Sequence, residues 1–186
     1  MDFLPIFMKM RGAPALVVGG GDVALRKARL LHEAGCRLTI VAPECHPELA
    51  EWIASGGVRQ LARGFMPEDI AGQRLVIAAT DDEAVNAQVS ALCMAQNIPV
   101  NVVDNPRLCS FIMPSIIDRS PVIVAISSSG GLPVLARWLR TQIEALLPAG
   151  LARLGRFGQE VRPRLKTAMP DANQRRGFWE RLLASP

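Results

Sequence analysis

Unbroken apolar runs alternate with amphipathic patterns over residues 1–104. The runs are short and rich in valine, leucine and isoleucine, which is typical of strands buried on both faces of a parallel sheet. Between them, apolar positions recur at spacings of three and four, which predicts helices that cover the sheet. Predicted strands cover residues 15–18, 37–42, 58–61, 75–79 and 100–103, and predicted helices cover residues 22–34, 47–55 and 81–96. This order indicates an α/β fold with a doubly wound parallel sheet.

The pattern changes after residue 110. Residues 116–118 and 121–127 resemble two strands joined by a short turn, which predicts an antiparallel hairpin. A strongly apolar helix is predicted over residues 133–147, and two basic amphipathic helices follow over residues 151–184. Because a hairpin and one apolar helix cannot enclose a core alone, we expect them to pack against a second copy in a twofold homodimer.

The first predicted strand runs directly into three consecutive glycines, and a predicted helix follows. This is the context that the dinucleotide-binding fingerprint requires, here as G-x-G-x-x-A with Ala24 in the third place. We expect Gly19 to make the tight turn and Gly21 to let a pyrophosphate approach the backbone. The N–H groups of Gly21, Asp22 and Val23 would face the phosphates at the positive end of the helix. The alternative is a turn whose glycines serve packing alone.

Polar residues also follow two other predicted strands. Thr80 comes after the fourth strand, where it is expected to cap the next helix, and Asp104 comes after the fifth. Ligands of doubly wound sheets bind beyond the carboxyl ends of the strands, so we expect both residues and the glycine turn to share one crevice. Asp104 is the candidate acid or base, since it is an isolated carboxylate there. A structural Asx turn is its alternative role.

The end of the second predicted strand carries the candidate ribose contact. Pro43 follows the strand, and Glu44 comes 20 positions after Ala24. A carboxylate at about this distance binds the ribose hydroxyl of NAD in dinucleotide-binding folds. No arginine follows directly to meet a 2′-phosphate, which favours NAD over NADP. An ordinary surface glutamate is the alternative.

Composition narrows the class of protein. The 186 residues are 49% apolar and 20% charged, enough for one compact core and a small appendage. The chain has no run of 18 apolar residues, so no membrane span is predicted. The N-terminal stretch does not resemble a secretion signal. The four cysteines lie far apart with no C-x-x-C, which favours a reducing cytoplasm and predicts neither disulfides nor a fixed metal site.

Positive charge is concentrated in the last part of the chain. The net charge is +4, and residues 149–186 hold eight Arg or Lys against three acids. An anionic small substrate, a solvated helical face and nucleic acid would each explain this excess. No nucleic-acid-binding module is recognisable, so nucleic acid is not expected as a partner.

A serine- and glycine-rich loop precedes the apolar helix. It reads S-S-S-G-G-L-P over residues 127–133. Its hydroxyls and the free N–H groups of the following helix would suit carboxylates or phosphate. Simple helix capping is the alternative.

At this point the chain resembles a family. The motifs V-V-G-G-G-D-V-A-L-R-K-A-R-L-L, A-A-T-D-D, N-V-V-D-N-P, S-F-I-M-P-S-I-I-D-R-S-P and S-S-S-G-G-L-P-V-L-A-R resemble the dehydrogenase–chelatase module of siroheme synthase. The resemblance covers the chain from Met1 to about Leu183. It implies a Rossmann-like NAD-binding domain over residues 1–113, a dimerisation region over 114–148 and a small helical domain over 149–186.

The resemblance also implies an activity: NAD-dependent oxidation of precorrin-2 to sirohydrochlorin, then insertion of ferrous iron, a substrate, to give siroheme. An intertwined homodimer is the implied assembly. The family's larger members carry a methyltransferase domain after this module. The chain is therefore expected to be either a stand-alone bifunctional enzyme or one module of such a protein.

The resemblance also implies which residues form the site, by matching positions in the family's motifs. The pyrophosphate falls at the glycine turn, and the adenosine ribose falls near Pro43 and Glu44. Asp104 matches the family's catalytic aspartate, used in both oxidation and metal insertion. Asn101, on the same strand, and Ser128 are expected to contact the tetrapyrrole, and Ser128 matches a serine that can carry a phosphate. Ser129 and Leu132 depart from the commoner form of that loop.

Two rival functions remain on the sequence alone. A non-catalytic NAD-sensing module would share the glycine turn without needing Asp104 or the serine–glycine loop. A chelatase without oxidation would not need an intact glycine turn. Co²⁺ would serve the same insertion chemistry as Fe²⁺.

Overall fold

The computed structural model describes residues 1–184, and the chain divides into two compact units, Met1–Met113 and a second that begins at Pro114. Residues 185–186 of the predicted helical domain lie outside the described residues. Residues 1–13 form neither helix nor strand. No helix among the described residues has both the length and the apolar character that crossing a membrane demands.

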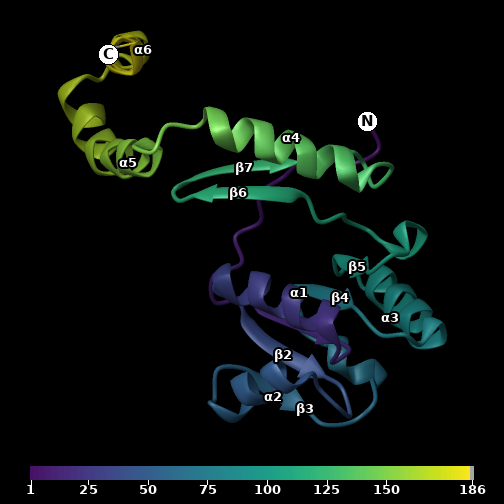
Figure 1. Ribbon diagram of the computed structural model, residues 1–186. Coiled ribbons are helices and arrows are strands. Elements are labelled where there is room, and N and C mark those ends of the chain that lie inside the picture. The colour runs from purple at the N-terminus through teal and green to yellow at the C-terminus, as the bar shows by residue number, and fades with distance from the viewer. Residues whose placement is uncertain (185–186) are drawn as a thin grey trace. The chain divides into compact units, whose positions relative to one another are not determined.

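Five parallel strands form the centre of the first unit, in the spatial order β3-β2-β1-β4-β5 (Figure 1). The strands are β1 (Pro14–Val18), β2 (Arg37–Val41), β3 (Arg59–Leu61), β4 (Leu75–Ala78) and β5 (Val100–Val102). The chain moves from β1 outward to β3 and then returns to the other side of β1 for β4 and β5. The strand order therefore reverses between β1 and β4, and this confirms the predicted doubly wound parallel sheet.

Helices cover both faces of this sheet. They are α1 (Asp22–Glu33), α2 (Pro47–Ala54) and α3 (Glu83–Ala95), with the short 3₁₀ helices η1 (Pro67–Ile70) and η2 (Pro106–Leu108). Side chains alternate along β1, so Ala15 and Val17 pack with α1 and α2, whereas Leu16 and Val18 pack with α3. All four are at most 2% exposed. Burial on both faces explains why these strands are continuous apolar runs.

The second unit contains an antiparallel hairpin and three helices. Its elements are β6 (Ser115–Arg119), β7 (Val122–Ile126), α4 (Pro133–Leu146), α5 (Leu151–Ala168) and α6 (Ala172–Ala184). Helix α4 lies along the hairpin (Figure 1), where Arg140 Nε donates to the carbonyl of Ile116 at 2.9 Å. The Glu144 carboxylate forms ion pairs with Arg119 and Arg140, each with an N–O distance of 2.9 Å. The hairpin and the helices agree with the predicted elements.

One predicted local role is wrong. Thr80 does not cap α3, because the chain makes one further turn before the helix begins. Asp82 is the N-cap, and its carboxylate accepts from the N–H groups of Ala84 at 2.9 Å and Val85 at 3.1 Å. A carboxylate at this position also interacts favourably with the helix dipole. Thr80 is thereby released for contacts at the edge of the sheet.

Candidate functional site

The turn after β1 needs glycine at two positions for steric reasons. Gly19 has φ of +121°, and a Cβ there would lie 2.2 Å from the carbonyl oxygen of Ala79. A Cβ at Gly20 would lie 2.0 Å from the carbonyl oxygen of Glu44. Both contacts are with backbone atoms that cannot rotate away. The turn is therefore pressed between the loop after β2 and the end of β4.

Gly21 differs from its two neighbours, because a Cβ there would meet no atom within 4 Å. It is the N-cap of α1, with no side chain capping the helix. The first N–H groups of an α-helix have no partner within the helix, so those of Asp22 and Val23 point out of its end. Open space at a glycine N-cap, in front of free donors and a positive helix end, fits a pyrophosphate group.

The loop after β2 holds the glycine turn in place. His46 donates its backbone N–H to the carbonyl of Gly20 at 2.7 Å. Its Nε2 lies 3.1 Å from a carboxylate oxygen of Asp22, and its Nδ1 accepts from the N–H of Glu48 at 3.3 Å. Because Nδ1 is an acceptor, a neutral ring carries its proton on Nε2, the nitrogen that lies near Asp22. His46 is a residue that the sequence analysis missed, since one histidine at a helix start carries no distinctive signal.

A pocket of about 260 Å³ lies at the carboxyl edge of the sheet. Its lining combines the start of α1, the segment after β4 and the segment after β5: Val23, Ala79, Thr80, Asp81, Glu83, Asn86, Val103, Asp104 and Asn105. Three residues predicted from separate parts of the sequence, Val23, Thr80 and Asp104, are thus neighbours. The pocket lies where the strand order reverses, which is where doubly wound sheets bind ligands.

Thr80 is fixed by a buried asparagine on α3. The Thr80 hydroxyl lies 3.0 Å from Oδ1 of Asn86, and Nδ2 of Asn86 donates to the Thr80 carbonyl at 2.9 Å. Asn86 is only 8% exposed, and paired hydrogen bonds make such burial tolerable. The sequence carried a weak signal for this role, namely a polar residue on an otherwise buried helical face.

Asp104 is exposed and adopts the left-handed conformation, with φ of +57°. Aspartate tolerates this region better than most residues, at a modest energetic cost. The backbone on both sides is fixed, because Val103 donates to the carbonyl of Ala78 at 2.9 Å and the Cys109 thiol lies 3.1 Å from the N–H of Val102. The carboxylate is therefore presented at the pocket from a rigid strand end.

Lys27 is a half-buried cation on α1 that the sequence analysis did not select. Burial, followed by the positive charge of Arg26, lowers the pKa of its ammonium group, while attraction to Asp104 and Cys109 opposes the shift. Burial also raises the pKa of the Cys109 thiol. A hydrogen bond with the Val102 backbone and the positive charge of Lys27 act in the opposite direction and lower it. Lys27 therefore places positive charge near the Asp104 end of the sheet.

The other predicted site residues have distinct positions. Pro43 and Glu44 are exposed in the loop that touches the glycine turn. Asn101 is 8% exposed, does not line the pocket, and donates Nδ2 to the carbonyl of Phe111 at 3.1 Å. Ser128 belongs to the second unit, where its Oγ accepts from the N–H of Leu132 at 3.2 Å. Residues 1–184 hold no cluster of three or more potential metal ligands.

Family models match both parts of the chain. Residues 6–115 match a family described as "Putative NAD(P)-binding", and residues 150–186 match the sirohaem synthase dimerisation region. The second match falls on the segment that the sequence analysis assigned to the small helical domain. The assignment of the dimer contact to residues 114–148 stays a prediction.

Curated relatives and a solved structure are also similar to this chain. A siroheme synthase of Pseudomonas entomophila is 53% identical over all 186 residues, which cover 40% of that protein. Another, of Ectopseudomonas mendocina, is 56% identical over 97% of this chain and 38% of its own length. The chain thus spans about two fifths of these relatives. The precorrin-2 dehydrogenase SirC has the same fold, with a TM-score of 0.77 at 23% identity over 98% of this chain and 90% of SirC.

Proposed function

The chain belongs to the family of the N-terminal NAD(P)-binding module of siroheme synthase, and from that premise we propose that it oxidises precorrin-2 to sirohydrochlorin with NAD as the acceptor. We propose further that it then inserts ferrous iron, its second substrate, to give siroheme. The observation that carries the proposal is the pocket in which the start of α1, Thr80 and Asp104 meet.

The glycine turn fits NAD. Open space at Gly21 and the free N–H groups at the start of α1 would hold the pyrophosphate. The neighbouring loop would place Glu44 at the ribose, where its carboxylate accepts from a hydroxyl and repels the 2′-phosphate of NADP. When bound, NAD supplies a nicotinamide that accepts hydride. The rest of the chemistry then depends on the chain's own residues.

Asp104 would act as the base. Oxidation of precorrin-2 removes one hydride and one proton, and the hydride goes to the cofactor. The Asp104 carboxylate, exposed at the pocket, takes the proton. Lys27 lies close enough to Asp104 for their opposite charges to attract, and it adds a positive charge to this end of the pocket.

Iron insertion would use the same carboxylate. Two pyrrole protons leave the macrocycle as the metal enters, and Asp104 can accept them in turn and pass them to water. A carboxylate is a hard oxygen ligand, so it can also guide Fe²⁺ transiently. Ser128, Asn101 and the basic helices of the second unit are proposed to meet the substrate's carboxylates.

A homodimer in the reducing cytoplasm is the proposed working form. It is supported by the match of residues 150–186 to a dimerisation region and by the free state of all four cysteines. The relatives are longer, so we also propose that the module operates next to a methyltransferase domain in a full-length protein.

An anaerobic assay tests the proposal. The chain is incubated with precorrin-2 and NAD, and the spectrum of sirohydrochlorin is followed together with NADH formation. Asp104→Asn keeps a residue that tolerates positive φ but removes the base, so oxidation should fall by about 10²- to 10⁴-fold while NAD affinity is retained. Glu51→Gln, which removes an exposed carboxylate of α2 that does not line the pocket, is the control.

Oxidation and iron insertion can be measured separately in the Asp104→Asn variant. If Asp104 serves both, iron insertion into supplied sirohydrochlorin should fall as well. Retained oxidation in a folded Asp104→Asn protein would refute the base role. NAD binding by the wild-type chain without any turnover of precorrin-2 would favour a sensing module instead.

A further inference from the structure

His46 joins three segments at the glycine turn, although the proposed chemistry at Asp104 does not use it. It ends the loop that carries Glu44, and its backbone N–H donates to the carbonyl of Gly20 at 2.7 Å. Its half-buried side chain contacts the start of α1 and the start of α2. A polar side chain with this many neighbours can fix the arrangement of the groups around it.

The two ring nitrogens of His46 have different partners. Nδ1 accepts from the N–H of Glu48 at 3.3 Å and so caps α2. Nε2 lies 3.1 Å from Oδ1 of Asp22, the first residue of α1. A short acceptor such as asparagine, serine or aspartate would be enough to cap the helix. The Nε2 atom therefore adds a contact that capping does not require.

Asp22 brings a negative charge to the proposed pyrophosphate site. Its backbone N–H is one of the donors at the start of α1, whereas its carboxylate has the same sign of charge as a phosphate. The side chain is 78% exposed, and among the ion pairs of residues 1–184 the one that involves Asp22 is with His46. A carboxylate here favours the helix dipole but repels a phosphate placed close to it.

The position of the His46 ring beside α1 does not depend on the cap alone. The backbone hydrogen bond to Gly20 involves no side-chain atom of His46. Arg29 of α1 also forms an ion pair with Glu48 in the first turn of α2. Both partners of that pair are exposed, so its energy is small, but it lies between the same two helices. The contact of Nε2 with Asp22 can therefore be altered while the loop stays in place.

We propose that His46 is a positioning residue for the bound dinucleotide. Its Nε2 directs the Asp22 carboxylate toward the loop after β2, which leaves the N–H groups at the start of α1 to the pyrophosphate. Its Nδ1 serves the fold by capping α2. The inference rests on the NAD site of the proposed function, but not on the reaction at Asp104.

Two amide substitutions separate the roles of the two nitrogens. Asparagine replaces Nδ1 as a cap but has no atom at the place of Nε2, whereas glutamine reaches further and is not a favoured N-cap. In calorimetry, His46→Asn should weaken NAD binding about five- to tenfold and keep the unfolding temperature of the wild type. His46→Gln should lower the unfolding temperature and keep the NAD affinity within about threefold. Weaker NAD binding by the glutamine variant than by the asparagine variant would overturn the proposal.

A double-mutant cycle tests whether His46 acts through Asp22. In an Asp22→Asn background the carboxylate is gone, so His46→Asn should change the NAD dissociation constant less than about twofold. An equal loss of affinity in both backgrounds would overturn the proposal, because His46 would then act by another route. The matched control is His32→Asn at the chain's other histidine, in the last turn of α1. A loss there as large as that of His46→Asn would also overturn it.

Steady-state kinetics distinguishes positioning of the cofactor from general damage to the fold. His46→Asn should raise the KM for NAD and leave kcat for precorrin-2 oxidation within about twofold, because the chemical step takes place at Asp104. A lower kcat with an unchanged KM would contradict the proposal, as would a wild-type chain that binds no NAD. If NAD binding depends on His46 but precorrin-2 is not oxidised, the proposed function fails and this inference stands.

Discussion

Adjacent glycines of the turn after β1 have different roles in space. Gly20 is needed because the backbone of Glu44 occupies the place of a Cβ, and its carbonyl also accepts the N–H of His46. Gly21 has open space in that direction and caps α1. One glycine therefore serves the fold, and the other leaves room for a ligand.

Substitutions at these two positions should separate stability from NAD binding. Gly20→Ala forces backbone against backbone and should lower the free energy of unfolding by about 1–3 kcal/mol. Gly21→Asp places a favourable N-cap residue at α1, so stability should be unchanged or higher. Its charge would repel the pyrophosphate, and NAD affinity should fall more than tenfold. Thermal denaturation and calorimetry measure the two effects, and undiminished NAD affinity in Gly21→Asp would remove the site from this turn.

At the scale of elements, a buried ion pair holds η1 to the chain after β3. The Asp69 carboxylate is 3% exposed and accepts two hydrogen bonds from Arg63, at 2.7 and 2.8 Å. It also accepts from the N–H of Met66 at 2.8 Å. The hydrogen bonds from Arg63 outweigh burial and lower the pKa of Asp69. This cluster fixes the crossover that returns the chain from β3 to β4.

The lowered pKa of Asp69 predicts a stability that depends on pH. Its contribution is complete above the unfolded pKa of about 3.9 and is lost as the pH falls toward the lower folded value. Asp69→Asn should therefore cost about 1–3 kcal/mol at pH 7, and the difference from wild type should shrink below about pH 4. Urea denaturation across this range measures it. Glu68→Gln, an exposed neighbour with the same charge change, should have little effect; a similar loss there would assign the effect to net charge.

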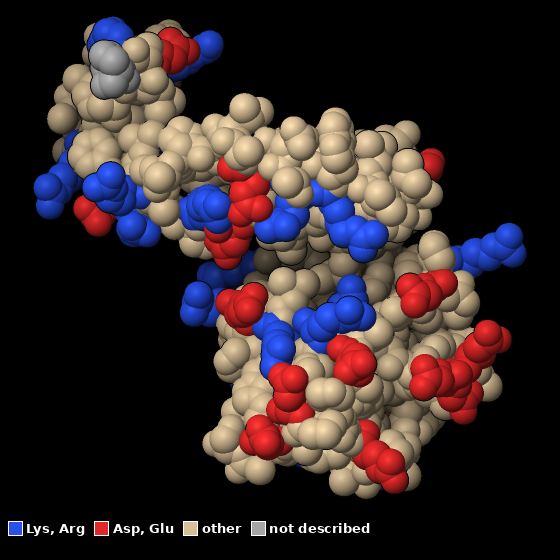
Figure 2. All heavy atoms as spheres, viewed as in Figure 1, with Lys and Arg blue, Asp and Glu red and all other residues tan. Residues whose placement is uncertain are grey.

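At the scale of the whole molecule, α4 exposes a run of large apolar side chains. Val134 is 61% exposed, Trp138 57% and Leu146 80%. In the view of Figure 2 the surface over α4 is largely uncharged. An exposed apolar helix face of this kind marks an interaction surface, and a second copy of the chain is the partner we propose for it.

Trp138→Asp should weaken the homodimer. Large aromatic residues at interfaces contribute about 2–4 kcal/mol, so the dimer dissociation constant should rise roughly 30- to 1000-fold. Sedimentation at micromolar concentration measures this change. Met94→Asp provides the control, since it puts an acid at an exposed apolar position of α3 in the first unit. An unchanged dimer in the Trp138 variant would move the contact elsewhere, for instance to residues 150–186.

Local sequence determined the elements and their order. Strands buried on both faces are continuous apolar runs, helices show the period of their buried stripe, and glycine and proline mark the turns, so each can be detected within a short window. The glycine turn and the residue after β5 were predicted in the same way. The pyrophosphate position at Gly21 and the candidate base Asp104 were selected on these grounds.

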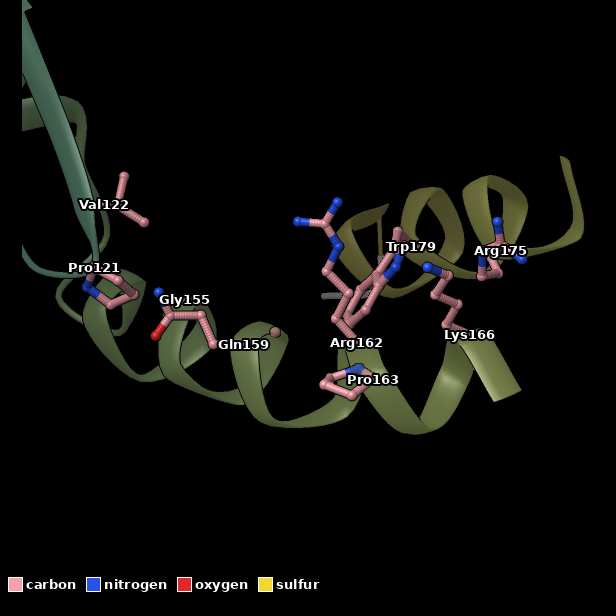
Figure 3. Close-up of a pocket in the computed structure, with 10 residues that line it drawn as sticks. Pro121, Val122, Gly155, Gln159, Arg162, Pro163, Lys166, Arg175 and Trp179 are labelled. Carbon is pink, nitrogen blue, oxygen red and sulfur yellow. The ribbon is translucent and has the colours of Figure 1, made fainter. Parts of the chain in front are cut away.

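Only the tertiary structure decided which residues meet. Lys27 and Asp104 attract each other from segments far apart in the chain, and no local period records such a pairing. Asp82 replaces Thr80 as the cap, because its carboxylate reaches the N–H groups of Ala84 and Val85 while Thr80 is paired with Asn86. Gly155 lets α5 approach the hairpin turn (Figure 3), because a Cβ there would lie 2.9 Å from Cγ of Pro121, and no short window of the sequence signals this contact.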